Sequence, residues 1–222
     1  METFASKQVN WRIDALPAPT QKALGWLAKQ AWLKKTDWYL AGGTAMALQV
    51  GNRSSVDLDF FTPQKDFNAG KLLARFPSKD WKTTLLKEGT IYGELFGAKV
   101  SFIAYPFFVS ANPNLWYGNV RVLEVTDIAV MKMVAISQRG KKRDFFDLYW
   151  YVKNKEPLRD VFLRLRRQYP ETAHNYHHIV KSLAYFADAE DDPELKLFFS
   201  ASWKEVKRFL SGEAKKLMET LL

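Results

Sequence analysis

The spacing of hydrophobic and polar residues divides the chain into a mixed first part and a helical second part. Apolar residues recur at helical spacing over residues 16–34, and residues 44–50 predict a second, compact helix. Runs of strand-forming residues that stop at glycine or proline predict strands over residues 38–41, 55–61, 82–87, 90–95, 99–105 and 120–125, the last of them as an edge. These elements indicate a small mixed sheet of about five strands with helices on its faces.

After residue 126 the pattern is helical throughout. Helices are predicted over residues 128–138, 143–153, 158–168, 175–187 and 194–222. Thr126 and Asp127 are expected to cap the first of these helices, Gly140 to end it, and Gly212 to interrupt the last one. The predicted fold class is therefore α+β, with a small mixed-sheet core over residues 1–125 and a helical part over residues 126–222 packed on it.

Composition removes several classes of protein. Of the 222 residues, 47% are hydrophobic and 26% charged, which is typical of a globular chain. No apolar run approaches the roughly 20 residues of a membrane span. The absence of cysteine excludes a disulfide scaffold, a cysteine zinc site and a cysteine nucleophile. The N-terminus lacks the apolar core of a signal peptide, so we expect a cytoplasmic protein without membrane partners.

The charge is positive and unevenly distributed. The chain has 33 lysines and arginines against 24 acids, a net charge of +9. Residues 132–167 contain eleven basic residues and four acids, whereas residues 188–194 form an acidic turn. A basic surplus of this kind favours an anionic partner such as a nucleotide or a nucleic acid, although basic surfaces also serve solubility alone.

The first chemical motif combines a glycine turn with two aspartates. Gly42-Gly43-Thr44 opens a predicted helix, where free backbone N–H groups and the helix dipole suit a phosphate. Asp57 and Asp59 are two apart on the next predicted strand, so both carboxylates point to one face. Paired carboxylates and phosphate oxygens are the ligands that Mg²⁺ prefers. The alternative is an ordinary turn followed by a strand with two solvent-facing aspartates.

A loop arginine and a helical motif extend this hypothesis. Arg53 precedes the carboxylates, where it either reaches a triphosphate or pairs with Asp57. Lys132 lies on the helix predicted over 128–138, and Asp144 and Asp147 share one face of the next helix. A lysine near phosphates and a further acid near a metal suit phosphoryl-type transfer. The alternative is a helical hairpin held together by pairs of basic and acidic side chains.

Together these motifs resemble a known family. The segments LAGGTAMAL, GNRSSVDLDFF and LEVTDIAVMKMVAISQRGKKRDFFDLYWYV are similar to the AbiEii/AbiGii toxins of type IV toxin–antitoxin systems, within the DNA polymerase β-like nucleotidyltransferase superfamily. The resemblance implies a nucleotidyltransferase core and transfer of a nucleotide from an NTP to an acceptor, with RNA such as tRNA as the expected acceptor. It also implies a cognate antitoxin that acts without a stable complex.

The resemblance assigns roles to the motif residues. It implies that Asp57 and Asp59 bind Mg²⁺ or Mn²⁺, and that Lys132, Asp144 and Asp147 belong with them to the catalytic set, Asp147 before Asp144. It implies a nucleotide-binding set as well, formed by Gly42, Gly43, Thr44, Arg53 and Lys132.

One departure from the superfamily pattern leaves other functions open. Many members have a third carboxylate on a central strand, and here Ser101 stands in the strand where it is expected. A catalytically inactive nucleotide- or RNA-binding protein therefore remains an alternative, as does a metal-dependent phosphohydrolase. In addition, Trp11, Trp26, Trp32 and Trp116 are candidates for an exposed platform on which a base stacks.

Overall fold

The computed structural model describes residues 9–221. Within them, one sheet has the strand order β3-β4-β5-β2-β1-β7-β6. The strands are β1 (Tyr39–Ala41), β2 (Leu58–Thr62), β3 (Trp81–Lys87), β4 (Thr90–Leu95), β5 (Ala98–Ala104), β6 (Leu115–Tyr117) and β7 (Val120–Val122). Parallel and antiparallel pairs alternate around β2, which pairs with β1 antiparallel and with β5 parallel. The fold class is α+β, as the sequence predicts.

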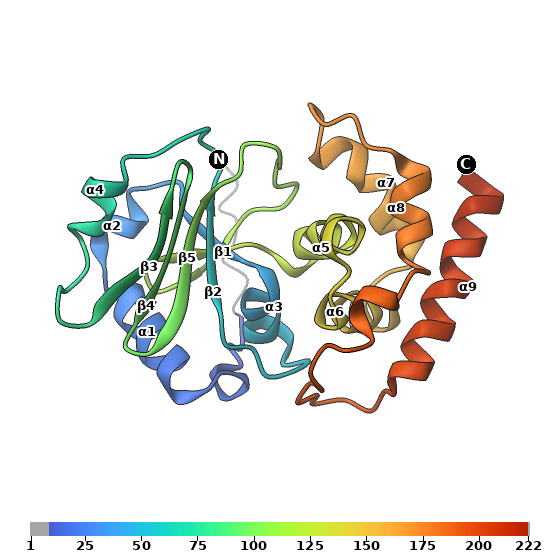
Figure 1. Ribbon diagram of the computed structural model, residues 1–222, viewed down its shortest axis with the longest axis horizontal. Helices are drawn as coiled ribbons and strands as arrows, with labels where there is room; N and C mark the ends of the chain where they lie inside the picture. Colours follow the sequence, from blue (N-terminus) through green and yellow to red (C-terminus); the bar gives the residue numbers. More distant parts are fainter. Residues whose placement is uncertain (1–8, 222) are drawn as a thin grey trace, which may run out of the picture.

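Helices cover both faces of this sheet and continue beyond it (Figure 1). The helices are α1 (Ala18–Ala28), α2 (Ala31–Lys34), α3 (Gly42–Val50), α4 (Ala69–Leu73), α5 (Val125–Arg139), α6 (Lys142–Asn154), α7 (Leu158–Gln168), α8 (Tyr176–Ser182) and α9 (Trp203–Leu221). In Figure 1, α1, α2 and α4 lie on one side of the sheet and α3, α5 and α6 on the other. Helices α7, α8 and α9 pack outside α5 and α6. None of the helices described is long and apolar enough to cross a membrane, and cytoplasmic localisation stays a prediction.

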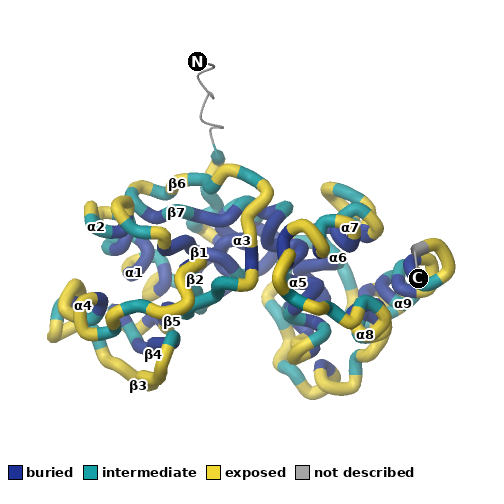
Figure 2. Tube along the Cα trace, turned by 90° about the horizontal axis from the view of Figure 1, so that it is seen from above, coloured by how far each residue is buried: buried dark blue, intermediate teal, exposed yellow. Residues whose placement is uncertain are grey.

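The central strand β2 separates apolar from polar side chains by simple alternation. Leu58 and Phe60 are fully buried on one face, where Phe60 stacks on Phe102 of β5. Asp59 and Phe61 point to the other face, in register with Ser101 and Ile103. The expected placement of these apolar side chains in the core is therefore confirmed. The sheet ends in an exposed strand at β3, and Figure 2 shows how the exposed trace runs along it.

The second part departs from the prediction at its end. The helix predicted over 194–222 begins only at Trp203 and then continues through Gly212 without a break. Residues 196–198 are extended because their backbone bonds to another loop: Ser54 N–H donates to Lys196, and Phe198 N–H donates to Asn52. The helix predicted over 175–187 is likewise shortened to α8. The sequence prediction also missed the short elements α4 and β6.

Helix α5 has the predicted end but a different start. Gly140 is in the left-handed conformation at φ 52° and ends the helix as expected. Glu124, and not the predicted Thr126-Asp127 pair, is the N-cap, because its carboxylate accepts from Thr126 N–H at 2.7 Å. The fully buried Asp127 carboxylate instead accepts hydrogen bonds from Ser110, Asn112 and Gln168. It thereby ties the loop after β5 to α5 and α7.

Candidate active site

A cavity of about 820 Å³ lies between the sheet and helices α5 and α6. Gly42, Gly43, Asp57 and Asp59 line it from the sheet side. Lys132, Arg139 and Arg143 line it from the helical side. The fold therefore brings together two motifs that are about ninety positions apart in the sequence, which confirms that the glycine turn, the paired aspartates and Lys132 share one cavity.

The two aspartates differ in their surroundings. The Asp59 carboxylate accepts a hydrogen bond from Ser101 Oγ at 2.7 Å, and none of the described basic side chains lies within 4 Å of it. Burial raises the pKa of Asp59, and the charge of Asp57 raises it further against the opposing effect of Ser101. Asp57, in contrast, pairs with Arg143 at 3.2 Å. Ser101 therefore occupies the position beside Asp59 where the superfamily pattern leads us to expect an acid.

These carboxylates fit a hard divalent cation. Asp59 is an incompletely compensated negative group facing the cavity, and Asp57, which lies directly before β2 and not on it as predicted, adds a second carboxylate to the lining. Within residues 9–221, no group of three or more histidine, cysteine, aspartate or glutamate side chains is placed to hold a metal. A donor set of two carboxylates suits Mg²⁺, which retains water and takes further oxygens from substrate phosphates.

The glycine turn has little spare room. Gly42 has φ +71°, and a Cβ there would lie 3.2 Å from Asp59 Oδ2. A Cβ on Gly43 would lie 2.3 Å from Arg53 Nη2, which is closer than real contacts allow. The turn is therefore packed directly against the carboxylate and the guanidinium that flank the cavity.

Thr44 differs from the prediction. Its hydroxyl donates to the backbone carbonyl of Asp57 and accepts from Ser55 Oγ, 2.9 Å away. The side chain is buried and is not part of the cavity lining. It thus holds the loop before Asp57. The sequence analysis places Thr44 in the nucleotide-binding set, but its hydroxyl does not face the cavity.

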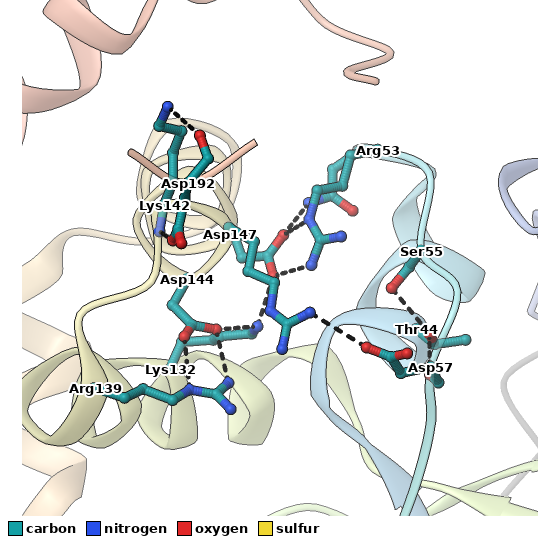
Figure 3. A network of polar contacts seen from close by, with 12 residues as sticks. Thr44, Arg53, Ser55, Asp57, Lys132, Arg139, Lys142, Asp144, Asp147 and Asp192 are labelled. Atoms are coloured by element: carbon teal, nitrogen blue, oxygen red, sulfur yellow. Dashed lines mark hydrogen bonds and ion pairs between the residues drawn. The ribbon is translucent and has the colours of Figure 1, made fainter. Parts of the chain in front are cut away.

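Asp144 and Asp147 form the buried centre of a charge network (Figure 3). Lys132 Nζ lies 2.7 Å from a carboxylate oxygen of each. Arg53 makes two hydrogen bonds of 2.8 Å to Asp147, and Arg139 donates to Asp144 at 3.0 Å. Burial by itself would raise the pKa of both carboxyls, but the adjacent cations outweigh it and hold each pKa below its usual range. Both acids therefore remain ionised counter-charges.

This network corrects the role predicted for the two late aspartates. Neither Asp144 nor Asp147 lines the cavity, because their carboxylates point into the packing between α5, α6 and the loop at Arg53. The sequence suggests Asp147 as a further acid near a metal, but this side chain lies outside the cavity and positions Lys132 and Arg53, which do line it. The partner of Arg53 is Asp147 and not Asp57, which the sequence analysis offers as one possibility. The alternative of a helical hairpin held by charge pairs is correct for this part of the motif.

An apolar wall completes the cavity. The sequence analysis missed its members, which are Phe61, Ile103, Tyr105, Ile128 and Met131. A signal was present, because Phe61 stands two positions after Asp59 and so shares its face of the strand. The cavity thus joins an apolar, partly aromatic end to a polar end that contains carboxylates and cations.

Part of the basic stretch binds acidic side chains or backbone carbonyls of the protein itself. Lys142 Nζ donates to the backbone carbonyl of Asp192 at 2.7 Å, and Lys141 pairs with the Asp192 carboxylate at 3.2 Å. Arg164 pairs with Glu156. The basic middle and the acidic turn, which the sequence suggests are separate surfaces, therefore bind each other.

Comparisons with known proteins bear on the family and the fold of the chain. The model of the family described as "Nucleotidyl transferase AbiEii toxin, Type IV TA system" matches residues 30–89 and 90–220. The chain is 35% identical over 189 residues to the uncharacterized protein aq_aa25 of Aquifex aeolicus, covering 82% of this chain and 89% of that protein.

Two solved structures have a similar fold. JHP933 from Helicobacter pylori has a TM-score of 0.54 at 20% identity, covering 93% of this chain and 94% of that one. MenT4, a nucleotidyltransferase toxin from Mycobacterium tuberculosis, has a TM-score of 0.55 at 12% identity, with coverages of 91% and 86%. The family model matches most of the chain, which confirms the resemblance carried by the sequence motifs. The chain belongs to the AbiEii family of nucleotidyl transferase toxins of type IV toxin–antitoxin systems.

Proposed function

We propose that the protein transfers a nucleotide from an NTP to a hydroxyl group of an RNA acceptor, with tRNA as the first candidate, and that the transfer depends on Mg²⁺ or Mn²⁺. The observation that carries this proposal is the pair of carboxylates, Asp59 on β2 and Asp57 directly before it, that lines one cavity with Lys132, Arg139 and Arg143. Opposite charges on facing walls suit a substrate that binds as a complex of metal and polyphosphate. Family membership supports the transferase chemistry.

Each wall has a distinct task in this reaction. Asp57 and Asp59 would hold the cation, which supplies positive charge at the phosphate oxygens. Lys132, Arg139 and Arg143 neutralise the remaining phosphate charge, and their buried counter-ions keep two of them in place without side-chain reorganisation. The acceptor hydroxyl loses its proton to solvent while its oxygen forms a bond to the α-phosphorus. The bond from the α-phosphorus to the oxygen that bridges to the β-phosphate breaks, so that pyrophosphate leaves. The apolar wall at Phe61 and Tyr105 suits the flat face of a base.

A transfer assay tests the proposal. Purified protein is incubated with each of the four α-³²P-labelled NTPs and total tRNA, with Mg²⁺, with Mn²⁺ or with EDTA. We expect labelled RNA only with a divalent cation, and a loss of about a hundredfold or more in rate for Asp57→Asn. Asp66→Asn is the matched control, because Asp66 is an exposed loop aspartate that is not part of the cavity lining. Labelling that survives EDTA, or an Asp57→Asn protein as active as the control, would refute the proposal.

Ser101 favours one alternative, an inactive protein that binds nucleotide or RNA. Its hydroxyl stands beside Asp59, so the site has one acid fewer than the superfamily pattern. Binding of RNA and NTP without labelling, across all four nucleotides and several acceptors, would support this alternative. Release of inorganic phosphate without labelled RNA would instead support a phosphohydrolase.

The role as a toxin is a separate part of the proposal. We propose that transfer inactivates an RNA that growth requires, and that the cognate antitoxin relieves this without a stable complex. Growth after induced expression of wild type and Asp57→Asn tests the first point, since only wild type should arrest it. Co-purification of an antitoxin with the protein in a stable complex would contradict the second.

A further inference from the structure

A second pocket lies on the opposite side of the sheet from the candidate active site. It has a volume of about 400 Å³ and lies between α2, α4 and the start of β1. Trp38 forms one wall and packs edge-on against Phe102, whose ring stacks on Phe60. Phe60 points away from the face that carries Asp59. The pocket and the catalytic cavity are therefore separated by the sheet, and Figure 1 shows α2 and α4 on the side away from α5 and α6.

The walls of this pocket combine flat rings with positive charge. Trp32, Trp38 and Phe67 contribute the rings, and the Trp38 and Phe67 centroids are 4.9 Å apart in an edge-to-face arrangement. Lys35, Lys71 and Arg75 contribute the cations. No acid is among the lining residues. Trp32 is also one of the tryptophans that the sequence suggests as a stacking platform.

The charge of these cations is not compensated within the described protein. Lys35, Lys71 and Arg75 are all exposed, and none has a carboxylate of residues 9–221 within 4 Å. In the basic stretch over residues 132–167, Lys132, Arg139, Lys141 and Arg164 pair with acids. Four other cations of that stretch are exposed and have no carboxylate of residues 9–221 within 4 Å: Lys153, Lys155, Arg166 and Arg167. The positive charge that is free to bind an external anion therefore includes this pocket, which the sequence analysis did not single out.

We propose that this pocket binds one nucleotide unit of a single-stranded RNA, with its base against the aromatic walls and its phosphates on Lys35, Lys71 and Arg75. Aromatic side chains beside cations are the usual means of binding single strands without sequence preference. The volume suits one nucleotide. The proposal that the transfer acceptor is RNA makes that acceptor the expected source of the strand, but binding here does not depend on catalysis.

The test compares two triple variants with the same change in net charge. Lys35→Gln/Lys71→Gln/Arg75→Gln removes the pocket cations. Lys29→Gln/Lys34→Gln/Lys79→Gln removes three exposed lysines of the same part of the chain that are not in the pocket lining. Fluorescence anisotropy with a labelled single-stranded RNA oligonucleotide, in EDTA and without NTP, measures affinity over a range of salt concentrations.

We expect the pocket variant to bind roughly tenfold more weakly and the control variant to change far less. The logarithm of the binding constant falls linearly with the logarithm of the salt concentration. The magnitude of this slope should be smaller by about 2 for the pocket variant, since each lost phosphate contact to a single strand removes about 0.7. Phe67→Leu should weaken binding of the single strand roughly fivefold, because a stacking ring is lost, without weakening binding of an RNA duplex of equal length. Equal losses in the two triple variants would overturn the proposal, because they would show a general charge effect.

Crosslinking locates the contact directly. With an oligonucleotide that contains 4-thiouridine, we expect ultraviolet adducts on peptides that include Trp32, Trp38 or Phe67, and the same adducts in Asp57→Asn. If the adducts form but no NTP labels RNA in the transfer assay, the RNA-binding role of this pocket is supported and only the transferase proposal is refuted. Absence of adducts on these peptides would overturn the RNA assignment. So would free UMP that fills the pocket without displacing the RNA oligonucleotide, and so would an acidic peptide that binds more tightly than RNA.

Discussion

Asp59 combines a charge with partial burial and lacks a cation beside it among the described residues. Because its pKa is raised in the folded protein, the native state holds this proton more tightly than the unfolded chain does. The ionised form therefore lowers stability as the pH rises from about 4 through the raised pKa. We predict that Asp59→Asn raises the melting temperature at pH 7 by a few degrees while it abolishes transfer.

Melting curves at pH 7 and pH 4 check this prediction. The gain should be larger at pH 7 than at pH 4, because more of the wild-type carboxylate is ionised at the higher pH, and Asp66→Asn serves as the exposed control. Asparagine keeps an oxygen that accepts from Ser101, so the hydrogen bond at this position is preserved. A melting temperature that falls at pH 7 would contradict the account of an uncompensated charge.

Arg143 competes with a cation for Asp57. Its guanidinium lies 3.2 Å from the carboxylate, and both side chains are partly exposed. An exposed ion pair contributes little stability, so its removal should leave the fold intact. We predict that Arg143→Gln binds Mn²⁺ a few-fold more tightly than wild type in calorimetric titration. The control is Arg121→Gln, which removes a pair with Asp37 away from the cavity; equal or weaker Mn²⁺ binding by Arg143→Gln would contradict the prediction.

The first turn of α3 requires a glycine at position 43, where there is no room for a side chain. A Cβ at Gly43 would meet the Arg53 guanidinium, and Arg53 is fixed by two bonds to buried Asp147. We predict that Gly43→Ala lowers the free energy of unfolding by roughly 1–3 kcal/mol, as over-packing does, and also weakens NTP binding. Gly25→Ala in α1 is the control, because open space surrounds that position and alanine favours a helix. Urea unfolding of both variants gives the comparison, and equal stabilities would contradict it.

Helices α5 and α6 are joined by charges that titrate at low pH. The pKa values of Asp144 and Asp147 are held down by Lys132, Arg139 and Arg53, so their contribution is complete above the unfolded pKa of about 3.9. It is lost as the pH falls through the native pKa values. We predict that urea stability drops between pH 4 and pH 2, and drops less in Lys132→Met, which has already lost part of this contribution.

The contacts of Lys132 with Asp144 and Asp147 affect how the activity of a Lys132 variant is interpreted. Loss of Lys132 leaves two buried carboxylates short of a cation, which typically costs about 3–5 kcal/mol. Reduced NTP use by such a variant therefore combines lost substrate contact with lost stability. A Lys132→Met protein as stable as wild type at pH 7 would contradict the network described.

The sheet-bearing and helical parts are held together by the loop at residues 51–57. Arg53 from the first part neutralises Asp147 of the second, and backbone bonds join residues 52–54 to residues 196–198. We predict that the predicted domains, 1–125 and 126–222, unfold in one transition seen equally by far-ultraviolet circular dichroism and tryptophan fluorescence. Arg53→Met should lower both midpoints together, and two separated transitions would contradict this.

Local pattern was sufficient for most elements and for one half of the cavity. Alternation along residues 57–61 places the aspartates on the face opposite Leu58 and Phe60, and a left-handed glycine ends α5 where Gly140 stands. These features depend on neighbours within a few positions, so the sequence carries them directly. The motifs also identified the family, and the family model that matches residues 30–89 and 90–220 confirms it.

Long-range contacts settled the rest. Whether Asp147 faces a substrate or a cation depends on where Arg53, ninety-four positions earlier, comes to lie, and no local spacing encodes that. Residues 194–202 have helical composition, but backbone bonds to residues 52–54 keep part of this stretch extended. Likewise, the sequence suggests separate basic and acidic surfaces, whereas Lys141 and Lys142 bind the acidic turn at Asp192. The charged partners and the competing hydrogen bonds come from segments that are distant in the sequence. These long-range contacts override the conformation that the local sequence favours.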